Sequence, residues 1–360
     1  MAIKRNYAIW NNKGGVGKST ITFHIASRYA ETHPDEDVLV IDMCPQANVS
    51  MMLLGGGTKG EDIVIQQCQM QSPQTVVGYI TESIVAGQNS VPDSMRFAIR
   101  PCTFNDDMPQ NLYLLCGDGN LEIIAPELSR RADEPRMTAS QEWPWVRVHT
   151  IIRNYITNFA QQREGRNVSV FIDTNPAFSI YTELAIVAAD KLICPVNADD
   201  SSKTAASAMA ILLHGSNPLH PIYGSWTFAE KAKKYKVKIP RIHLLVANRL
   251  TQYSGTAKTH VAKAYAAMSE GIAQQMFDLY LRYPDYFSQT SAIINSVTNF
   301  REVYSVYLRD FNSTGVVATH TGCPLSKMVL KSDVYGKDVQ LDKGKIQECL
   351  NAIDDVITKL

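Results

Sequence analysis

One glycine-rich stretch constrains this chain more than any other. Residues 7–20 read Tyr-Ala-Ile-Trp-Asn-Asn-Lys-Gly-Gly-Val-Gly-Lys-Ser-Thr, and the helical periodicity of Ile21 to Ala30 follows. The order predicts a strand, a loop and a helix. Glycines carry no Cβ, so the N–H groups of the loop can converge on a phosphate, and the N-terminus of the helix adds its dipole. The stretch therefore predicts a phosphate-binding loop.

Two side chains at the end of this loop carry the expected chemistry. Lys18 supplies a positive charge for the β- and γ-phosphates of a nucleotide, and the Ser19 hydroxyl is placed to bind Mg²⁺. We expect the nucleotide to contact seven consecutive residues: Gly14, Gly15, Val16, Gly17, Lys18, Ser19 and Thr20. A flexible loop without a ligand is the alternative, but the position of the motif between a strand and a helix argues against it.

The loop departs from the standard G-x-x-x-x-G-K-[ST] pattern at its start. Asn12 occupies the first glycine position, and an extra lysine, Lys13, precedes the glycine pair. This variant, K-G-G-V-G-K-S-T, resembles the deviant Walker A motif of the ParA/MinD/Soj family of dimerising ATPases. The resemblance implies ATP and Mg²⁺ as cofactors and hydrolysis of ATP to ADP and phosphate. It also implies a homodimer that forms on ATP binding, in which Lys13 reaches the phosphates of the partner's nucleotide.

A second segment resembles the D-x-D-P-Q-x-N switch of the same family. It follows a short, continuously apolar run, Val38 to Ile41, which predicts a buried parallel strand. Its matching positions are Asp42, Pro45, Gln46 and Asn48. Cys44 replaces the second aspartate, which in the family orients and polarises the attacking water.

The replacement at Cys44 leaves two hypotheses open. A thiol is mostly neutral at pH 7 and cannot polarise water as a carboxylate does, so its presence should slow hydrolysis. Alternatively, Cys44 is a small buried residue and a neighbour such as Asp42 takes over the task. The first hypothesis favours a nucleotide-locked dimeric switch or scaffold with little or no hydrolysis, and the second favours a cycling ATPase. We expect Lys13, Asp42 and Cys44 to be the catalytic positions.

Two further strand ends complete the predicted site. The apolar run Val168 to Ile172 ends at Asp173, where the Walker B acid of such proteins holds Mg²⁺ through water, so Ser19 and Asp173 are the expected metal residues. Asn248 follows another apolar run, Ile242 to Ala247. The family places an asparagine there that reads adenine, and its amide has both a donor and an acceptor.

Alternating apolar strands and amphipathic helices predict an α/β fold. We expect a doubly wound, mostly parallel sheet with helices on both faces, and the nucleotide at the carboxyl ends of the strands. Residues 1–360 form one ParA-like domain in this prediction, and the region 55–150 matches the family poorly. Within it we expect a helix over Val76 to Val85, a strand over Leu112 to Leu115 and a surface insertion from Ile124 to Trp145. Trp143 and Trp145 are a partner site or a packing anchor, and we favour the anchor.

The charge composition bears on possible partners. Lys+Arg and Asp+Glu both number 35, so no overall charge draws the chain to nucleic acid. One stretch is nevertheless rich in lysine: Lys231, Lys233, Lys234, Lys236 and Lys238. It is either a site for non-specific DNA binding, as in many ParA-like proteins, or a solvated helix and loop. The resemblance further implies an adaptor protein of ParB type. No helix-turn-helix precedes the Walker loop, so we do not expect operator binding.

Other classes of site are not expected. The seven cysteines form no C-x-x-C pair, and Cys102 and Cys116 lie outside the glycine-rich turns that hold an iron–sulphur cluster in related reductases. The C-terminal helix, Gly344 to Leu360, has an apolar stripe but carries acidic residues that anionic lipid would repel, so we expect it to pack on the body and not on a membrane. Neither a signal peptide nor a membrane-spanning run is visible, which predicts a cytoplasmic protein, associated with the nucleoid if it binds DNA.

Overall fold

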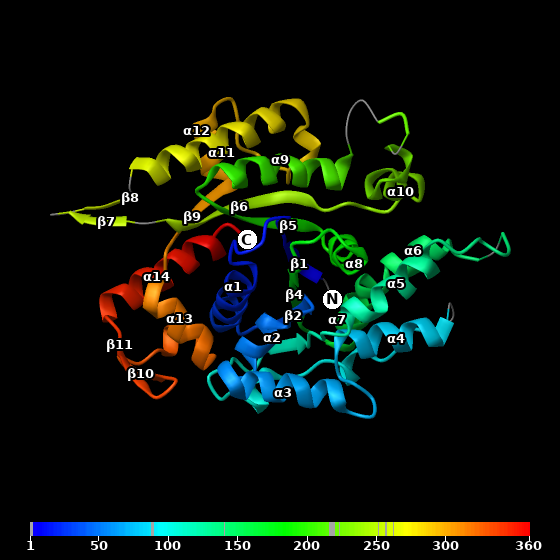
Figure 1. Ribbon diagram of the computed structural model, residues 1–360, viewed down its shortest axis with the longest axis horizontal. Coiled ribbons are helices and arrows are strands. Elements are labelled where there is room, and N and C mark those ends of the chain that lie inside the picture. The colour runs from blue at the N-terminus through cyan, green and yellow to red at the C-terminus, as the bar shows by residue number, and fades with distance from the viewer. Residues whose placement is uncertain are drawn as a thin grey trace.

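The computed structural model describes residues 3–87, 90–139, 141–215, 220–222, 224–250, 252–255, 258–261 and 263–360. A seven-stranded sheet in the order β3-β2-β4-β1-β5-β6-β9 runs through the molecule, and every pairing within it is parallel (Figure 1). Its strands are β1 (Ile3–Ile9), β2 (Glu36–Met43), β3 (Leu112–Leu115), β4 (Asn167–Thr174), β5 (Lys191–Asn197), β6 (Arg241–Leu250) and β9 (Ser305–Arg309). The predicted α/β fold with a parallel sheet is confirmed.

Helices cover both faces of this sheet. The α-helices are α1 (Lys18–Thr32), α2 (Asn48–Leu53), α3 (Gly57–Gln69), α4 (Val76–Ala86), α5 (Leu121–Ala132), α6 (Pro144–His149), α7 (Ile151–Gln162), α8 (Ile180–Ala188), α9 (Asp200–His214), α10 (Phe228–Lys234), α11 (Lys263–Arg282), α12 (Val297–Tyr304), α13 (Asn312–Thr321) and α14 (Lys343–Ile357). Short 3-10 turns occupy Ser94–Arg96, Pro101–Thr103, Gly224–Trp226, Pro284–Tyr286 and Leu325–Lys327. Two antiparallel hairpins join β7 (Gln252–Gly255) to β8 (Lys258–Val261) and β10 (Lys331–Val334) to β11 (Lys337–Gln340). Among the described residues no helix is both long and apolar enough to cross a bilayer.

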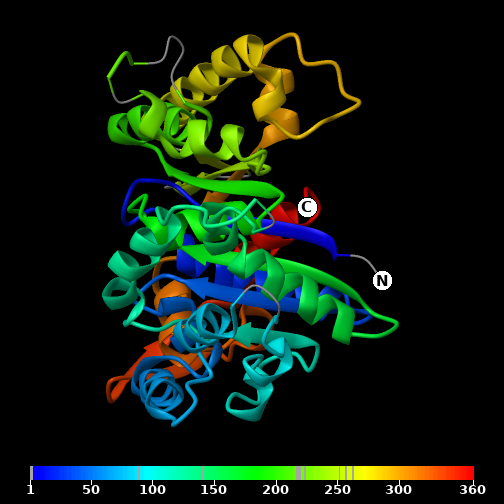
Figure 2. The same ribbon diagram turned by 90° about the vertical axis from the view of Figure 1, so that its right-hand side faces the viewer.

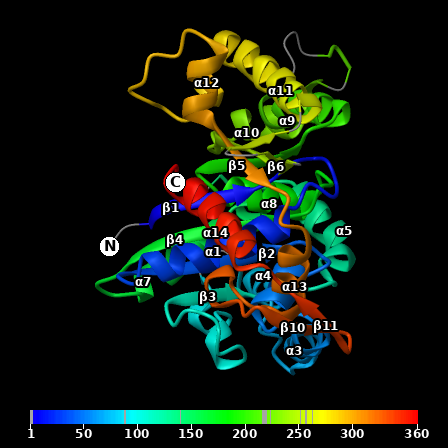
Figure 3. The same cartoon turned by 90° about the vertical axis from the view of Figure 1, so that its left-hand side faces the viewer.

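Alternation along the buried strands divides the core into two layers. Successive side chains of a strand point to opposite faces, so Leu39 and Ile41 of β2 join one apolar cluster while Val38 and Val40 join the other. The first cluster includes side chains of α4 to α12, and the second includes side chains of α1, α2, α3, α13 and α14. Beyond β6 and β9, α11 and α12 form one end of the molecule in both side views (Figure 2; Figure 3).

The C-terminal helix packs on the body, as its sequence predicts. Ile353 and Val356 of α14 are fully buried, and Figure 3 shows this helix beside α1. The Arg28 guanidinium donates to both carboxylate oxygens of Asp354 at 2.7 and 3.0 Å. The apolar stripe of α14 is therefore part of the core.

The poorly matched region contains more regular structure than the sequence indicated. The expected helix and strand are present as α4 and β3, but α3 was not expected. The stretch from Ile124, expected as a surface insertion, is mostly helical up to Ala132, and Leu128 packs into the core. Pro126 and many charged residues hide this pattern in the sequence. Trp145 is buried, as an anchor should be, whereas Trp143 is 42% exposed.

Candidate functional site

The glycine-rich loop joins the end of β1 to the start of α1. Gly15 and Gly17 have left-handed backbones, with φ of 71° and 86°. A Cβ on Gly17 would lie 2.4 Å from the Nδ2 atom of Asn248, so this position requires glycine. A Cβ on Gly14 or Gly15 would meet nothing within 4 Å, and both residues are exposed. The loop thus presents an open outer face, which leaves room for a bound phosphate.

The Lys18 side chain lies inside the loop. It is buried, and its Nζ atom donates to the backbone oxygens of Asn11 and Lys13 at 3.3 and 3.0 Å. Burial lowers the pKa of Lys18, and the nearby Asp173 and Cys44 oppose that shift. Among the described residues its hydrogen-bond partners are neutral carbonyl oxygens, so this positive charge is well suited to an anionic ligand.

The two predicted metal residues meet at the start of α1. The Ser19 hydroxyl donates to Oδ2 of Asp173 at 2.6 Å, and the Thr22 hydroxyl lies 3.3 Å from Oδ1. Asp173 stands on β4 and is fully buried. A hydroxyl next to a carboxylate is the donor set that Mg²⁺ uses in P-loop proteins.

A second carboxyl lies beside Asp173. Asp42 of β2 is its register partner, and both side chains are completely buried. Burial raises the pKa of Asp42 to about 6. Burial, together with the charge of Asp42, raises the pKa of Asp173 to about 7. A divalent cation would offset the repulsion between these two carboxylates, so the residues present fit Mg²⁺.

Asp42 also holds the switch segment. Its Oδ1 atom accepts from the Cys44 N–H at 3.0 Å, and its Oδ2 atom accepts from the N–H and hydroxyl of Ser50 at 3.0 and 2.8 Å. Cys44 is buried, and burial together with the charges of Asp42 and Asp173 raises the pKa of its thiol to about 12. Cys44 therefore stays neutral at pH 7, and both oxygens of Asp42 are already engaged.

The extra lysine of the loop contacts the start of α9. The Nζ atom of Lys13 lies 2.6 Å from both carboxylate oxygens of Asp199 and 3.3 Å from the Ser202 hydroxyl. Asp199 also caps α9 by accepting from the Ser202 N–H at 2.8 Å. Partial burial opposes ionisation of Asp199, but the bonds from Lys13 and Ser202 outweigh it and lower its pKa to about 2. Asp199 is not among the residues expected from the sequence, where its one signal is that of an acid just after the apolar run of β5.

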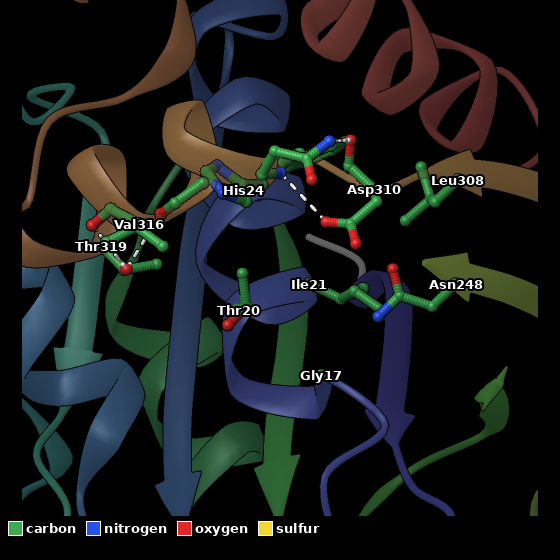
Figure 4. Close-up of a pocket in the computed structure, with 12 residues that line it drawn as sticks. Gly17, Thr20, Ile21, His24, Asn248, Leu308, Asp310, Val316 and Thr319 are labelled. Carbon is green, nitrogen blue, oxygen red and sulfur yellow. Dashed lines mark hydrogen bonds between the residues drawn. The ribbon is translucent and has the colours of Figure 1, made fainter. Parts of the chain in front are cut away.

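A cavity of about 240 Å³ continues from the loop between α1 and α13 (Figure 4). Asn248, at the end of β6, lies at this cavity, and its Nδ2 atom donates to the Val16 carbonyl at 2.9 Å. The lining comprises Gly17, Thr20, Ile21, His24, Asn248, Leu308, Asp310, Phe311, Asn312, Gly315, Val316 and Thr319. The structure thus brings the predicted base-reading residue to the loop, and α13 supplies a wall that sequence reasoning missed.

The lysine-rich stretch lies on and after α10, and several of its charges face acids. Lys231 bonds to Asp133 at 2.8 Å, and Lys238 bonds to Asp190 at 2.9 Å. The Lys233 side chain is 79% exposed and lies 4.0 Å from Glu230. The Lys234 ammonium lies 5.1 Å from the centre of the Tyr235 ring. This surface therefore has less net positive charge than its sequence suggests.

Comparisons with known proteins identify the family of this chain. A family model described as an AAA domain matches residues 4–214. A search of curated proteins by sequence gives no significant match.

Several solved structures share the fold over nearly the whole chain. An ATP complex of a McdA variant from Cyanothece has a TM-score of 0.60 at 12% identity, covering 99% of this chain and 98% of that one. A plasmid partition protein from Borrelia burgdorferi B31 bound to AMPPNP has a TM-score of 0.51 at 15% identity, with 99% of each chain covered. A ParA from pnob8 has a TM-score of 0.51 at 13% identity, with 98% of each chain covered. Because the AAA-domain model matches more than half of the 360 residues, this protein belongs to that family, as a ParA/MinD-like member.

Proposed function

We propose that this protein is a ParA-like ATPase that binds ATP with Mg²⁺ and acts in the partitioning or positioning of DNA or another cargo. The observation that carries the proposal is the arrangement of Lys18, Ser19 and Asp173 around an open glycine loop. The McdA and Borrelia structures, named as complexes with ATP and AMPPNP, add support. We place the protein in the cytoplasm, and at the nucleoid if it binds DNA.

Each group at the site has a role in this proposal. The N–H groups of residues 14–20 and the Lys18 ammonium bind the phosphates, while Ser19 and Asp173 hold Mg²⁺. The metal neutralises charge on the phosphates. Asp42 keeps the switch segment in place through Ser50 and the Cys44 N–H. Asn248 contacts the base at the mouth of the cavity.

Dimerisation and partner binding extend the proposal. Two chains close face to face around two ATP molecules, and Lys13 leaves Asp199 to reach the phosphates bound to the partner. The dimer then engages DNA without sequence preference and an adaptor protein of ParB type. The plasmid partition protein from Borrelia and the pnob8 ParA among the similar structures support the ParA-like part of this assignment.

Equilibrium binding of ATP with Mg²⁺, measured by calorimetry, tests the first step. Wild-type protein should bind, and Lys18→Ala should bind at least about tenfold more weakly because a charge-assisted contact to phosphate is lost. Lys337→Ala on β11 is the matched control: it removes an exposed lysine outside the loop and should bind like wild type. Wild-type protein that takes up no nucleotide would refute the proposal.

A second candidate function is a nucleotide-locked dimeric switch with little or no hydrolysis. The neutral, buried Cys44 thiol at the position of the water-orienting aspartate favours it. Phosphate release from wild type, Cys44→Asp and Cys44→Ser, with and without DNA, separates the candidates. If the switch hypothesis holds, Cys44→Asp is faster by about tenfold or more because a carboxylate polarises water, and Cys44→Ser stays slow. Wild-type turnover as fast as that of Cys44→Asp would eliminate the switch.

A further inference from the structure

The cavity beyond the glycine loop is formed by matching faces of two helices. The lining positions are 17, the N-cap of α1, and 20, 21 and 24 on α1, and on α13 they are 312, 315, 316 and 319. Both sets follow the three- and four-residue spacing of a single helix face. At 1.5 Å per residue, His24 lies about 10 Å along the α1 axis from Gly17. The cavity therefore begins where phosphates would bind and leads to His24 (Figure 4).

His24 is a buried polar side chain without a hydrogen-bond partner. It is 2% exposed, and within the described part of the chain neither ring nitrogen is bonded. Its ring packs edge-on against Phe23 and Phe311, with centroids 5.0 and 5.3 Å away. Buried polar groups are ordinarily paired, and an unpaired one destabilises the protein. The lining of this cavity thus contains a hydrogen-bonding group that a ligand can satisfy.

The protonation state of His24 fits a neutral ligand group. Burial lowers the pKa of the imidazole to about 3, so the ring is neutral at pH 7 and offers one donor and one acceptor. Around it the cavity combines apolar side chains, Ile21 and Leu308 among them, with the Asp310 carboxylate. An apolar cavity with a few polar groups is typical of a small-molecule site, and it suits the flat faces and polar edge of a nucleobase.

We infer that His24 is a specificity-determining residue of the nucleotide site, which reads the far edge of a purine through a hydrogen bond to its imidazole. The inference rests on the proposed binding of ATP at the glycine loop. In the ligand-free protein the imidazole is unpaired, and in the complex the purine pairs with it. A pyrimidine is one ring shorter, so it does not extend as far into the cavity. His24 therefore discriminates ATP from CTP, which carry the same triphosphate.

Equilibrium binding of three Mg²⁺-complexed ligands tests this: ATP, CTP and inorganic tripolyphosphate, which has no base. His24→Phe should weaken ATP binding about tenfold, the scale of a lost hydrogen bond in a buried site, and leave CTP and tripolyphosphate unchanged. His24→Gln, which keeps a donor and an acceptor, should retain most of the affinity for ATP. His320→Phe is the matched control, because this half-buried histidine of α13 does not line the cavity.

Thermal unfolding of the ligand-free variants separates ligand contact from packing. His24→Phe should be at least as stable as wild type, because it replaces an unpaired buried imidazole by an apolar ring between Phe23 and Phe311. Equal affinity of wild type and His24→Phe for ATP would overturn the role of His24 and leave the proposed function standing. So would a parallel loss of stability and of affinity for all three ligands. Wild-type protein that binds neither ATP nor tripolyphosphate would overturn the proposed function, and this inference with it.

Discussion

Asp42 and Asp173 are adjacent carboxyls at the ends of β2 and β4, and both are fully buried. Proteins seldom bury two acids side by side, because desolvation and mutual repulsion both oppose their ionisation. Here burial raises both pKa values, and the charge of Asp42 raises that of Asp173 further. Without a cation the pair is therefore held in a partly protonated state.

This pair makes stability depend on pH. A carboxyl whose pKa is higher in the folded protein than in the unfolded chain binds more protons when folded, so its stabilising contribution falls as pH rises from about 4 to about 7. Asp173→Asn removes most of this dependence. Relative to wild type, the variant should gain up to about 1.4 kcal/mol of stability per pH unit across this range.

Urea unfolding of wild type and Asp173→Asn without nucleotide at pH 5, 6, 7 and 8 measures the difference. Buried histidines with lowered pKa values, namely His24, His214 and His243, give the opposite slope below pH 6.5, and they cancel in this comparison. If the stability of Asp173→Asn relative to wild type fails to rise between pH 5 and pH 7, the raised pKa of Asp173 is contradicted.

The residues of the loop were predictable, and their partners were not. Residues 14–20 lie in one short motif, so local spacing alone identifies them. Asp199 meets Lys13 across 186 positions, and the acceptor for the Ser19 hydroxyl lies 154 positions away. Asp173 was found because it directly ends the apolar run of β4, whereas Asp199 lies two residues beyond the end of β5 and His24 lies within α1. Their roles depend on how β5, α9 and α13 pack around the loop.

At the scale of elements, strands were predicted better than helices. Parallel strands buried on both faces have continuous apolar runs, as Val38 to Ile41 shows. The unexpected α3 buries Gly60, Val64 and Gln67, which lie on one helix face, but only Val64 among them has an apolar side chain, so the sequence carries a weak apolar pattern. It begins at the last of three consecutive glycines, Gly55 to Gly57, whose backbones all have positive φ. Where few side chains reach the core, periodicity is a weak signal.

Asp199, at the N-terminus of α9, holds the extra lysine of the loop, Lys13, in an ion pair. Asp199→Asn keeps an effective helix cap but removes the charge that pairs with Lys13, so Lys13 can leave at a lower energetic cost. The pair is partly exposed and is worth about 1 kcal/mol or less, and each dimer breaks two such pairs, so the ATP-dependent dimer should tighten about four- to 25-fold.

Sedimentation at graded protein concentrations with ATP and Mg²⁺ measures the change in dimerisation. Ser201→Ala, which leaves the ion pair in place, is the matched control, and Lys13→Ala with Asp199→Asn should behave like Lys13→Ala alone. A dimer of unchanged strength in Asp199→Asn would show that the contact does not restrain Lys13.

At the scale of the whole molecule, DNA binding requires a local surface because the formal net charge is zero. Lys233 and Lys234 both lie on α10. The Lys233 side chain is 79% exposed, whereas that of Lys231, which is paired with Asp133, is 35% exposed. If α10 forms the interface, Lys233→Glu with Lys234→Glu should abolish ATP-dependent binding to duplex DNA, through repulsion of the phosphates.

Filter binding or fluorescence anisotropy over a range of salt concentrations tests the surface. Reversal of Lys331 and Lys337 on the β10–β11 hairpin changes the net charge equally and is the matched control. Undiminished affinity in the α10 variant would place the DNA surface elsewhere or exclude it.

The central claim is that two chains close around two ATP molecules and that each lends the other Lys13. The most direct measurement is the mass in solution of wild type and Lys13→Ala, with and without ATP and Mg²⁺, by light scattering alongside nucleotide binding. The account predicts that the 40.0 kDa wild-type chain doubles in mass only with ATP and Mg²⁺. It predicts that Lys13→Ala binds the nucleotide but stays a monomer. A wild type that remains monomeric with ATP and Mg²⁺, or a Lys13→Ala dimer as stable as that of wild type, would contradict it.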